Sequence, residues 1–175
     1  MMAIDGESTL TDVCFTICTA LEHVGVTAVL TGGSAAAVYA PTVYQSRDAD
    51  FIVTMHAAGG AEALSELGYV EKGGTYFHRL SPFTLEFPHG PLAVGDDLIT
   101  AWETLRKDGL VLHILSRTDS VRDRLMWFYL DNDRSALRAA VGVAKSGLFD
   151  EEIVRDWSER EGFPRQHALF LEGMK

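Results

Sequence analysis

Two aspartates separated by one residue, Asp48 and Asp50, stand near the start of an apolar segment that is predicted to be a β-strand. Successive side chains of a strand point to opposite faces, so both carboxylates lie on one face, while Ala49, Phe51 and Val53 lie on the other. Holding two negative charges this close is costly unless a cation compensates them. Mg²⁺ is a common partner of carboxylate oxygens that also handle phosphates. The pair therefore predicts a divalent-cation site.

A glycine-rich turn precedes this pair in the chain. Gly32, Gly33 and Ser34 follow a predicted strand over residues 27–31 and open a predicted short helix over residues 34–40. The glycines permit a tight turn and the close approach of a ligand. The free N–H groups and the dipole of a helix N-terminus favour an anion. The turn therefore predicts a phosphate site.

Each of these features has an ordinary structural explanation when it occurs alone. A Gly-Gly-Ser sequence is often only a turn, and an Asp-x-Asp sequence is often a solvated strand end. Their order, with a predicted strand before the turn and another carrying the acids, favours the functional interpretation. Together they predict an enzyme that handles a nucleoside triphosphate (NTP).

At Gly32-Gly33-Ser34 and Asp48-Ala49-Asp50-Phe51 the chain resembles the nucleotidyltransferase superfamily with the DNA-polymerase-β-like core. Among its members it looks most similar to minimal nucleotidyltransferases that include AbiEii-type toxins of bacterial toxin–antitoxin systems. The resemblance implies a small α/β core, two divalent ions (Mg²⁺ or Mn²⁺) and transfer of a nucleotide from an NTP to an acceptor hydroxyl. It further implies that the acceptor could be RNA, notably tRNA, and that an antitoxin protein could be a partner.

A third acid stands on a later predicted strand, residues 83–87. Thr84 and Glu86 share one face of this strand, whereas its apolar residues share the other. The resemblance implies that a third carboxylate completes the metal site and helps to deprotonate the acceptor hydroxyl, and Glu86 is the candidate. The alternative is a glutamate that simply faces solvent.

The resemblance also implies a basic residue that contacts the triphosphate from a helix predicted over residues 117–130. Arg124 is the candidate, and Arg122 is its substitute if Arg124 faces away. The planar guanidinium suits this role because it can bind phosphate oxygens in bidentate fashion. The alternative is a salt bridge on the helix surface, between Arg124 and Asp123 or Asp131.

The predicted fold class is α/β (α+β), a small mixed sheet flanked by helices with a helical C-terminal part. Strands alternate with helices over residues 1–116, the predicted core, and helices dominate residues 117–175, which we expect to pack on it as one compact unit. Within the core we expect a short helix or helical turn over residues 95–105. The strongly apolar segment 109–115 is predicted to be a central strand.

Composition limits the possible partners. The chain of 175 residues is 47% hydrophobic and carries a net charge of −10, which argues against a broad nucleic-acid-binding surface. An RNA acceptor would therefore need a local cationic patch. No apolar run is long enough to span a membrane and no secretory signal is evident, so we expect a cytoplasmic protein. Cys14 and Cys18 are expected to be buried thiols.

Other enzyme classes lack their signatures. The sequence has no Gly-x-x-x-x-Gly-Lys-Ser/Thr loop, no paired Cys-x-x-Cys, no His-Glu-x-x-His and no Gly-x-Ser-x-Gly. P-loop NTPases, structural zinc sites and serine hydrolases are therefore unsupported. Two alternatives to a nucleotidyltransferase stay open. One is a catalytically inactive nucleotide-binding or partner-binding module with the same fold, and the other is an inert interaction protein that binds no NTP.

Overall fold

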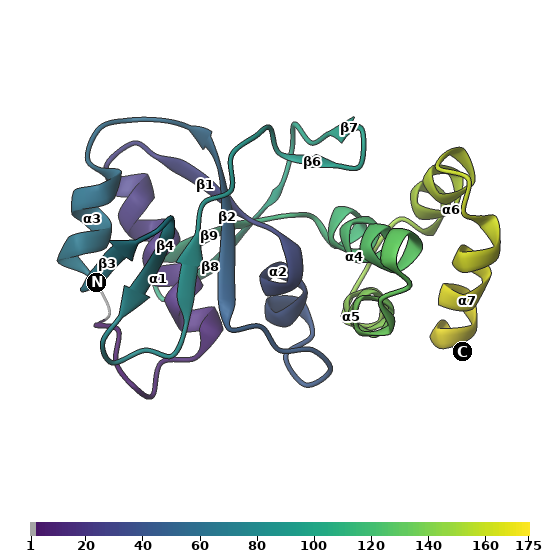
Figure 1. Cartoon of the computed structure of the whole chain (residues 1–175), viewed down its shortest axis with the longest axis horizontal. Coiled ribbons are helices and arrows are strands. Elements are labelled where there is room, and N and C mark those ends of the chain that lie inside the picture. Colours follow the sequence, from purple (N-terminus) through teal and green to yellow (C-terminus); the bar gives the residue numbers. More distant parts are fainter. Residues whose placement is uncertain (1–2) are drawn as a thin grey trace.

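The core of the molecule is a mixed seven-stranded sheet, and the helical C-terminal part lies beyond one side of it (Figure 1). This computed structural model describes residues 3–175. The strand order is β3-β4-β5-β2-β1-β9-β8. The strands are β1 (Thr27–Leu30), β2 (Asp48–Met55), β3 (Tyr69–Lys72), β4 (Thr75–His78), β5 (Thr84–Glu86), β8 (Glu103–Lys107) and β9 (Leu110–Ile114). The predicted fold class is confirmed.

Local sequence signals explain where several helices begin. Thr9 forms a reciprocal capping box with Asp12 at the start of the first helix, and the hydroxyl of Ser116 caps the fourth. Pro164 occupies the first turn of the last helix, where a missing N–H costs nothing. The helices are α1 (Leu10–His23), α2 (Gly32–Tyr39), α3 (Gly60–Glu66), α4 (Arg117–Asp131), α5 (Arg134–Lys145), α6 (Glu151–Arg160) and α7 (Pro164–Met174). None of these helices is long and apolar enough to cross a membrane.

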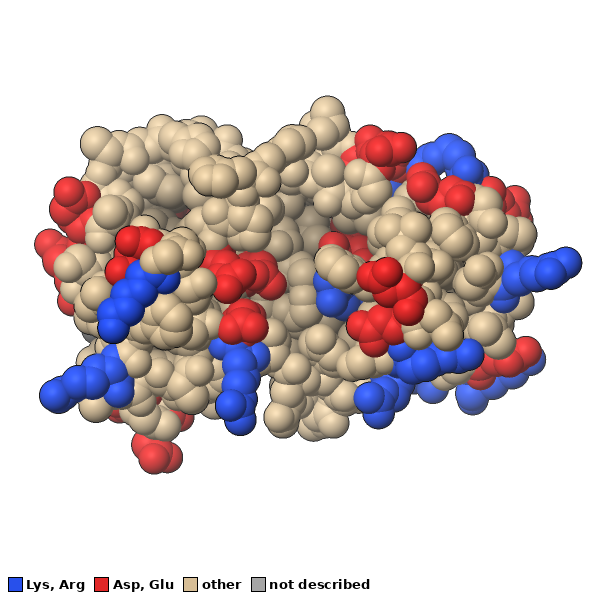
Figure 2. Space-filling view, viewed as in Figure 1, with Lys and Arg blue, Asp and Glu red and all other residues tan. Residues whose placement is uncertain are grey.

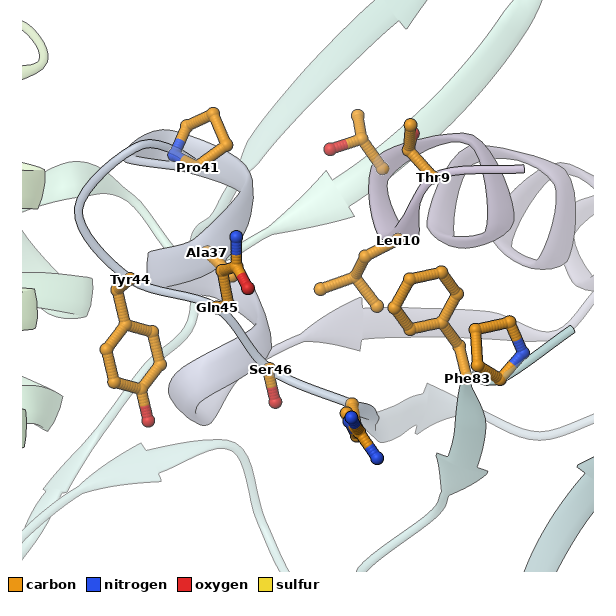
Figure 3. A pocket seen from close by; sticks show the side chains of 11 residues that line it. Thr9, Leu10, Ala37, Pro41, Tyr44, Gln45, Ser46 and Phe83 are labelled. Carbon is orange, nitrogen blue, oxygen red and sulfur yellow. The ribbon is translucent and has the colours of Figure 1, made fainter. Parts of the chain in front are cut away.

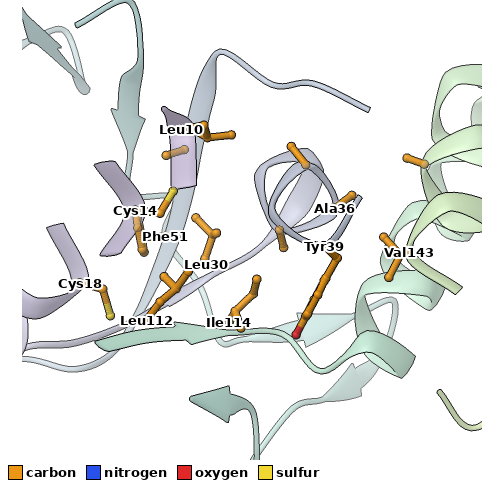
Figure 4. Packing of buried hydrophobic residues seen from close by; sticks show 14 of the residues in the cluster. Leu10, Cys14, Cys18, Leu30, Ala36, Tyr39, Phe51, Leu112, Ile114 and Val143 are labelled. Atoms are coloured by element: carbon orange, nitrogen blue, oxygen red, sulfur yellow. The ribbon is translucent and has the colours of Figure 1, made fainter. Parts of the chain in front are cut away.

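One hydrophobic cluster contains residues of α1, the sheet, α2 and the C-terminal helices. Figure 4 shows side chains of α1 and the strands meeting those of α2, with Val143 of α5 on the far side of α2. Cys14 and Cys18 lie in this cluster as free, buried thiols, as the sequence predicts. Because α2 packs against β2 as well as α4 and α5, it links the sheet to the helical part.

Two expectations about the second half of the core are wrong. Residues 95–105 form no helix: β6 (Ala93–Val94) and β7 (Asp97–Leu98) pair as a small separate hairpin, followed by strand β8. Gly95 has a φ of +57°, which turns the chain tightly between β6 and β7. The apolar strand β9, predicted to be central, is second from the sheet edge because β8 pairs along its outer side. The central strand is β2.

Candidate active site

The two aspartates lie on β2, the central strand, and the third acid lies on its neighbour β5. The strands run parallel, with Asp48 opposite Thr84 and Asp50 opposite Glu86. Ala49 is fully buried beneath the sheet, so the alternation of faces follows the sequence pattern. The register therefore places Glu86 directly beside Asp50. We refer to Asp48, Asp50 and Glu86 as the carboxylate triad.

The glycine turn lies against the middle carboxylate of this triad. The backbone N–H of Thr31 donates to the carbonyl of Asp50 at 2.9 Å, which fixes the turn to β2. Gly32 has a φ of +64°, and a Cβ at this position would lie 3.1 Å from Oδ2 of Asp50. Glycine is thus required twice here, for the left-handed backbone and for the space beside the carboxylate.

The hydroxyl of Ser34 is engaged by the backbone on both sides of the glycine turn. Helix α2 begins at Gly32, two residues earlier than predicted, and the Ser34 side chain is fully buried. Its hydroxyl donates to the carbonyl of Thr31 at 2.8 Å and accepts from the backbone N–H of Asp50 at 3.1 Å. The hydroxyl therefore holds the turn against β2. In the first turn of α2, the backbone N–H groups are the donors that could bind a phosphate.

Arg124 reaches the same turn from α4. Its two terminal nitrogens lie 3.7 and 3.6 Å from the positions that a Cβ would take at Gly32 and Gly33. The guanidinium also donates to Oδ2 of Asp123, at 2.9 Å from Nε and 2.7 Å from Nη2. The expected position at the turn and the alternative salt bridge therefore coexist. Arg122, the substitute candidate, instead forms salt bridges with Asp97 and Asp119.

The middle carboxylate of the triad resists ionisation. Burial raises the pKa of Asp50 to about 6, and the nearby charges of Glu86 and Asp48 add to this effect. The positive charge of Arg124 opposes it only in part. A carboxyl group that resists ionisation because of burial and neighbouring carboxylates is one that a divalent cation would stabilise in its charged form.

The donor set of the triad suits a hard cation, although the side chains are not gathered around one point. Oδ1 of Asp48 accepts from Thr84, and Oε1 of Glu86 accepts from Thr75, so each acid retains one oxygen outside these bonds. Within residues 3–175 no three His, Cys, Asp or Glu side chains converge as a metal site. Oxygen ligands fit Mg²⁺ or Mn²⁺ chemically, and binding would draw the free oxygens together.

The pKa of Asp50 predicts how stability depends on pH and Mg²⁺. Because the folded-state pKa is raised from 3.8 to about 6, the metal-free fold binds this proton more tightly than the unfolded chain does. The contribution of the protonated Asp50 to the stability of the metal-free fold is complete below pH 4 and is lost as the pH rises through 6. We therefore expect Mg²⁺ to raise the melting temperature at pH 8 and hardly at all at pH 5. Calorimetric scans of the wild type and Asp50→Asn test this, and an equal Mg²⁺ effect in both proteins would contradict it.

One face of the molecule is hollowed. Figure 2 shows a depression between the sheet and the helical part, with acidic side chains on the sheet side and a basic side chain opposite. Tyr44 closes the turn from the loop after α2, since its hydroxyl lies 3.1 Å from the position of a Cβ at Gly33. No sequence pattern points to Tyr44, because it belongs to an irregular loop without periodicity.

A second hollow of about 700 Å³ lies beside this site (Figure 3). It is bounded by the start of α1, by the loop of residues 41–47, and by Phe83 before β5. Leu10 and Phe83 point into it, while Tyr44 borders both this hollow and the glycine turn. No member of the carboxylate triad lines it, so this hollow and the acidic site are distinct.

The comparisons with known proteins agree with this geometry at the level of the fold. No family model matches the chain, and no curated protein matches its sequence. Among solved structures, it is similar to an antigenic nucleotidyltransferase-like protein from Paracoccidioides brasiliensis, with a TM-score of 0.65 and 13% identity over 95% of this chain and 94% of that one. The chain has the nucleotidyltransferase fold.

A second solved structure has a similar fold. The antibiotic-resistance factor ANT(2'')-Ia aligns with a TM-score of 0.53 and 14% identity over 90% of this chain and 96% of that one. Both alignments cover nearly the whole of each chain, so the likeness includes the helical C-terminal part. At these identities the likeness concerns the fold, and the chemistry has to be argued from the site.

Proposed function

We propose that this protein is a metal-dependent nucleotidyltransferase that moves a nucleoside monophosphate from an NTP to an acceptor hydroxyl. One observation carries the proposal: the register of β2 and β5 places Asp50 and Glu86 side by side, against the glycine turn at the start of α2. A cation-binding acidic face and an anion-binding helix start are thereby adjacent. A metal–triphosphate complex requires both.

In the proposed reaction the acceptor oxygen attacks the α-phosphorus in line, and the bond between the α-phosphorus and the bridging oxygen breaks to release pyrophosphate. The N–H groups of Gly33 and Ser34 and the guanidinium of Arg124 hold the β- and γ-phosphates. Glu86 is the candidate to receive the hydroxyl proton. Asp48 and Asp50 would hold one Mg²⁺ or Mn²⁺ and share a second with Glu86, and such ions neutralise phosphate charge and lower the pKa of the hydroxyl.

The acceptor is proposed to be a hydroxyl of RNA, including tRNA, or of a protein, in keeping with the toxin-like resemblance. The net charge of −10 limits an RNA contact to a local cationic surface. An AbiEii-like role, with a cytoplasmic location and an antitoxin protein as partner, belongs to the same proposal.

An inactive nucleotide-binding module with the same fold is the second candidate. The observation that favours it is the arrangement of the triad, whose outer carboxylates bond to Thr84 and Thr75 and do not converge on one point within residues 3–175. Such a module would bind Mg²⁺–NTP without turning it over.

The experiment that separates the two is incubation with each α-labelled NTP and Mg²⁺ or Mn²⁺, with bacterial RNA and the protein itself as acceptors. Transfer of label that is lost in Asp48→Ala supports the enzyme. The matched control is Asp96→Ala, because Asp96 is an exposed acid in the β6–β7 turn, outside the site. Calorimetric NTP binding without any label transfer would instead support the inactive module.

A further inference from the structure

Trp127 stands out among the three tryptophans of the chain. Trp157 is buried and stacks on Tyr129, and Trp102 packs edge-on against His113. The side chain of Trp127 is 53% exposed, and no other aromatic ring of residues 3–175 pairs with it. Exposing this much of a large apolar ring is unfavourable, so its position relative to the proposed site is informative.

The geometry of α4 places Trp127 next to the residues that reach the site. It follows Arg124 by three positions and Asp123 by four, and residues at these spacings are neighbours on one helix face. Arg124 contacts the glycine turn, and its guanidinium donates to the carboxylate of Asp123. Trp127 therefore lies one helical turn beyond the residue of α4 that contacts the glycine turn.

The direction of helical side chains strengthens this placement. Each Cα–Cβ bond of an α-helix tilts towards the N-terminus, so a long side chain covers the turn that precedes its own Cα. For Trp127 the preceding turn contains Asp123 and Arg124. The exposed indole consequently lies over the turn of α4 that carries Asp123 and Arg124.

We propose that Trp127 is the platform on which the base of the bound NTP stacks. This inference rests on the proposed function and adds the residue that recognises the nucleoside. If the phosphates are held at Gly33 and Arg124, the indole of Trp127 lies one helical turn away from them. The uncharged part of the ligand, its nucleoside, can then stack on this ring. Stacking accepts any base because each has a π-face, and larger rings stack over more area. ATP and GTP should therefore bind more tightly than CTP and UTP.

The test compares two ligands that differ only in the nucleoside. Mg²⁺–ATP and Mg²⁺–tripolyphosphate are titrated calorimetrically into the wild type and Trp127→Ala. We expect the Kd for ATP to rise about 5- to 150-fold and the Kd for tripolyphosphate to stay unchanged. Trp127→Phe should restore most of the ATP affinity because it keeps a stacking ring.

Leu148→Ala is the matched control, since Leu148 is an exposed apolar side chain in the loop between α5 and α6 and not on α4. Unchanged ATP affinity in Trp127→Ala, or an equal loss for both ligands, would overturn the stacking role. Sedimentation that shows a wild-type dimer and a monomeric Trp127→Ala variant, with unchanged ATP affinity, would overturn it in favour of a protein interface. Failure of the wild type to bind either ligand would overturn the proposed function as well.

Discussion

Asp50→Asn is expected to abolish nucleotidyl transfer and, at the same time, to stabilise the metal-free fold. Transfer should fall by a factor of about 10³ or more, because the central ligand of the metal–triphosphate complex loses its charge. Stability should rise because the wild-type carboxyl is half-buried between Glu86 and Asp48, with a pKa raised to about 6. Allowing for solvent screening, we expect a gain of about 1 kcal/mol at pH 7.5, or about 2–4 °C in melting temperature.

The opposite signs make this prediction specific. A purely structural aspartate would lose stability when replaced, and a solvent-exposed one would change neither property. Label transfer measures the first effect and calorimetry without metal the second. Retained transfer, or a lower melting temperature without metal, would contradict the role given to Asp50. Asp96→Asn, at an exposed position away from the triad, should change neither.

Arg124→Gln is expected to weaken NTP binding by a factor of about 10 to 100, because a charged hydrogen-bond donor to the phosphates is removed. It also leaves Asp123 without its partner beside the triad, which adds to the repulsion of an anionic ligand. Calorimetric titration with Mg²⁺–NTP measures the effect. Arg124→Lys should recover only part of the affinity, since an ammonium cannot bind two oxygens with a planar fork.

Arg155→Gln provides the matched control for this prediction. Arg155 donates through Nε and Nη2 to the adjacent Asp156 on α6, which repeats the pairing of Arg124 with Asp123 on an exposed surface. Its replacement should leave NTP affinity unchanged. Equal losses in both variants would show that general charge, and not the position beside the glycine turn, governs binding.

The sequence predicts the shared face of Asp48 and Asp50 because the period of a strand is two residues. The same rule places Thr84 and Glu86 on one face of their strand. It does not predict that β5 pairs with β2 in parallel and in the register that puts Glu86 beside Asp50. Pairing between distant segments depends on tertiary packing, and the expectation for Glu86 comes from its place on the polar face of its strand together with the family resemblance.

Ser34 and the segment 95–105 show where local signals mislead. A serine after two glycines resembles a helix cap, yet the helix starts at Gly32 and the buried hydroxyl binds the backbone of Thr31 and Asp50. The segment 95–105 has no glycine after its first residue, but β8 is stabilised by pairing with β9, which no local pattern reveals. In both cases contacts with distant strands decide the outcome.

Arg124 illustrates the limit of choosing between neighbours on a helix. Arg122 and Arg124 differ by two positions and so point to different sides of α4. Both are buried, and both pair with aspartates. Only the packing of α4 on α2 shows that Arg124 is the one beside Gly32 and Gly33.

The most direct test of the account is a single incubation with NTP labelled separately at the α- and γ-phosphates, in the presence of Mg²⁺ and the acceptor. Nucleotidyl transfer predicts α-label on the acceptor and γ-label in pyrophosphate, with both products absent in Asp50→Asn. Transfer of the γ-label would identify a kinase. Release of both labels as nucleoside diphosphate and phosphate would identify a hydrolase, and either result would contradict the function proposed for the triad of Asp48, Asp50 and Glu86.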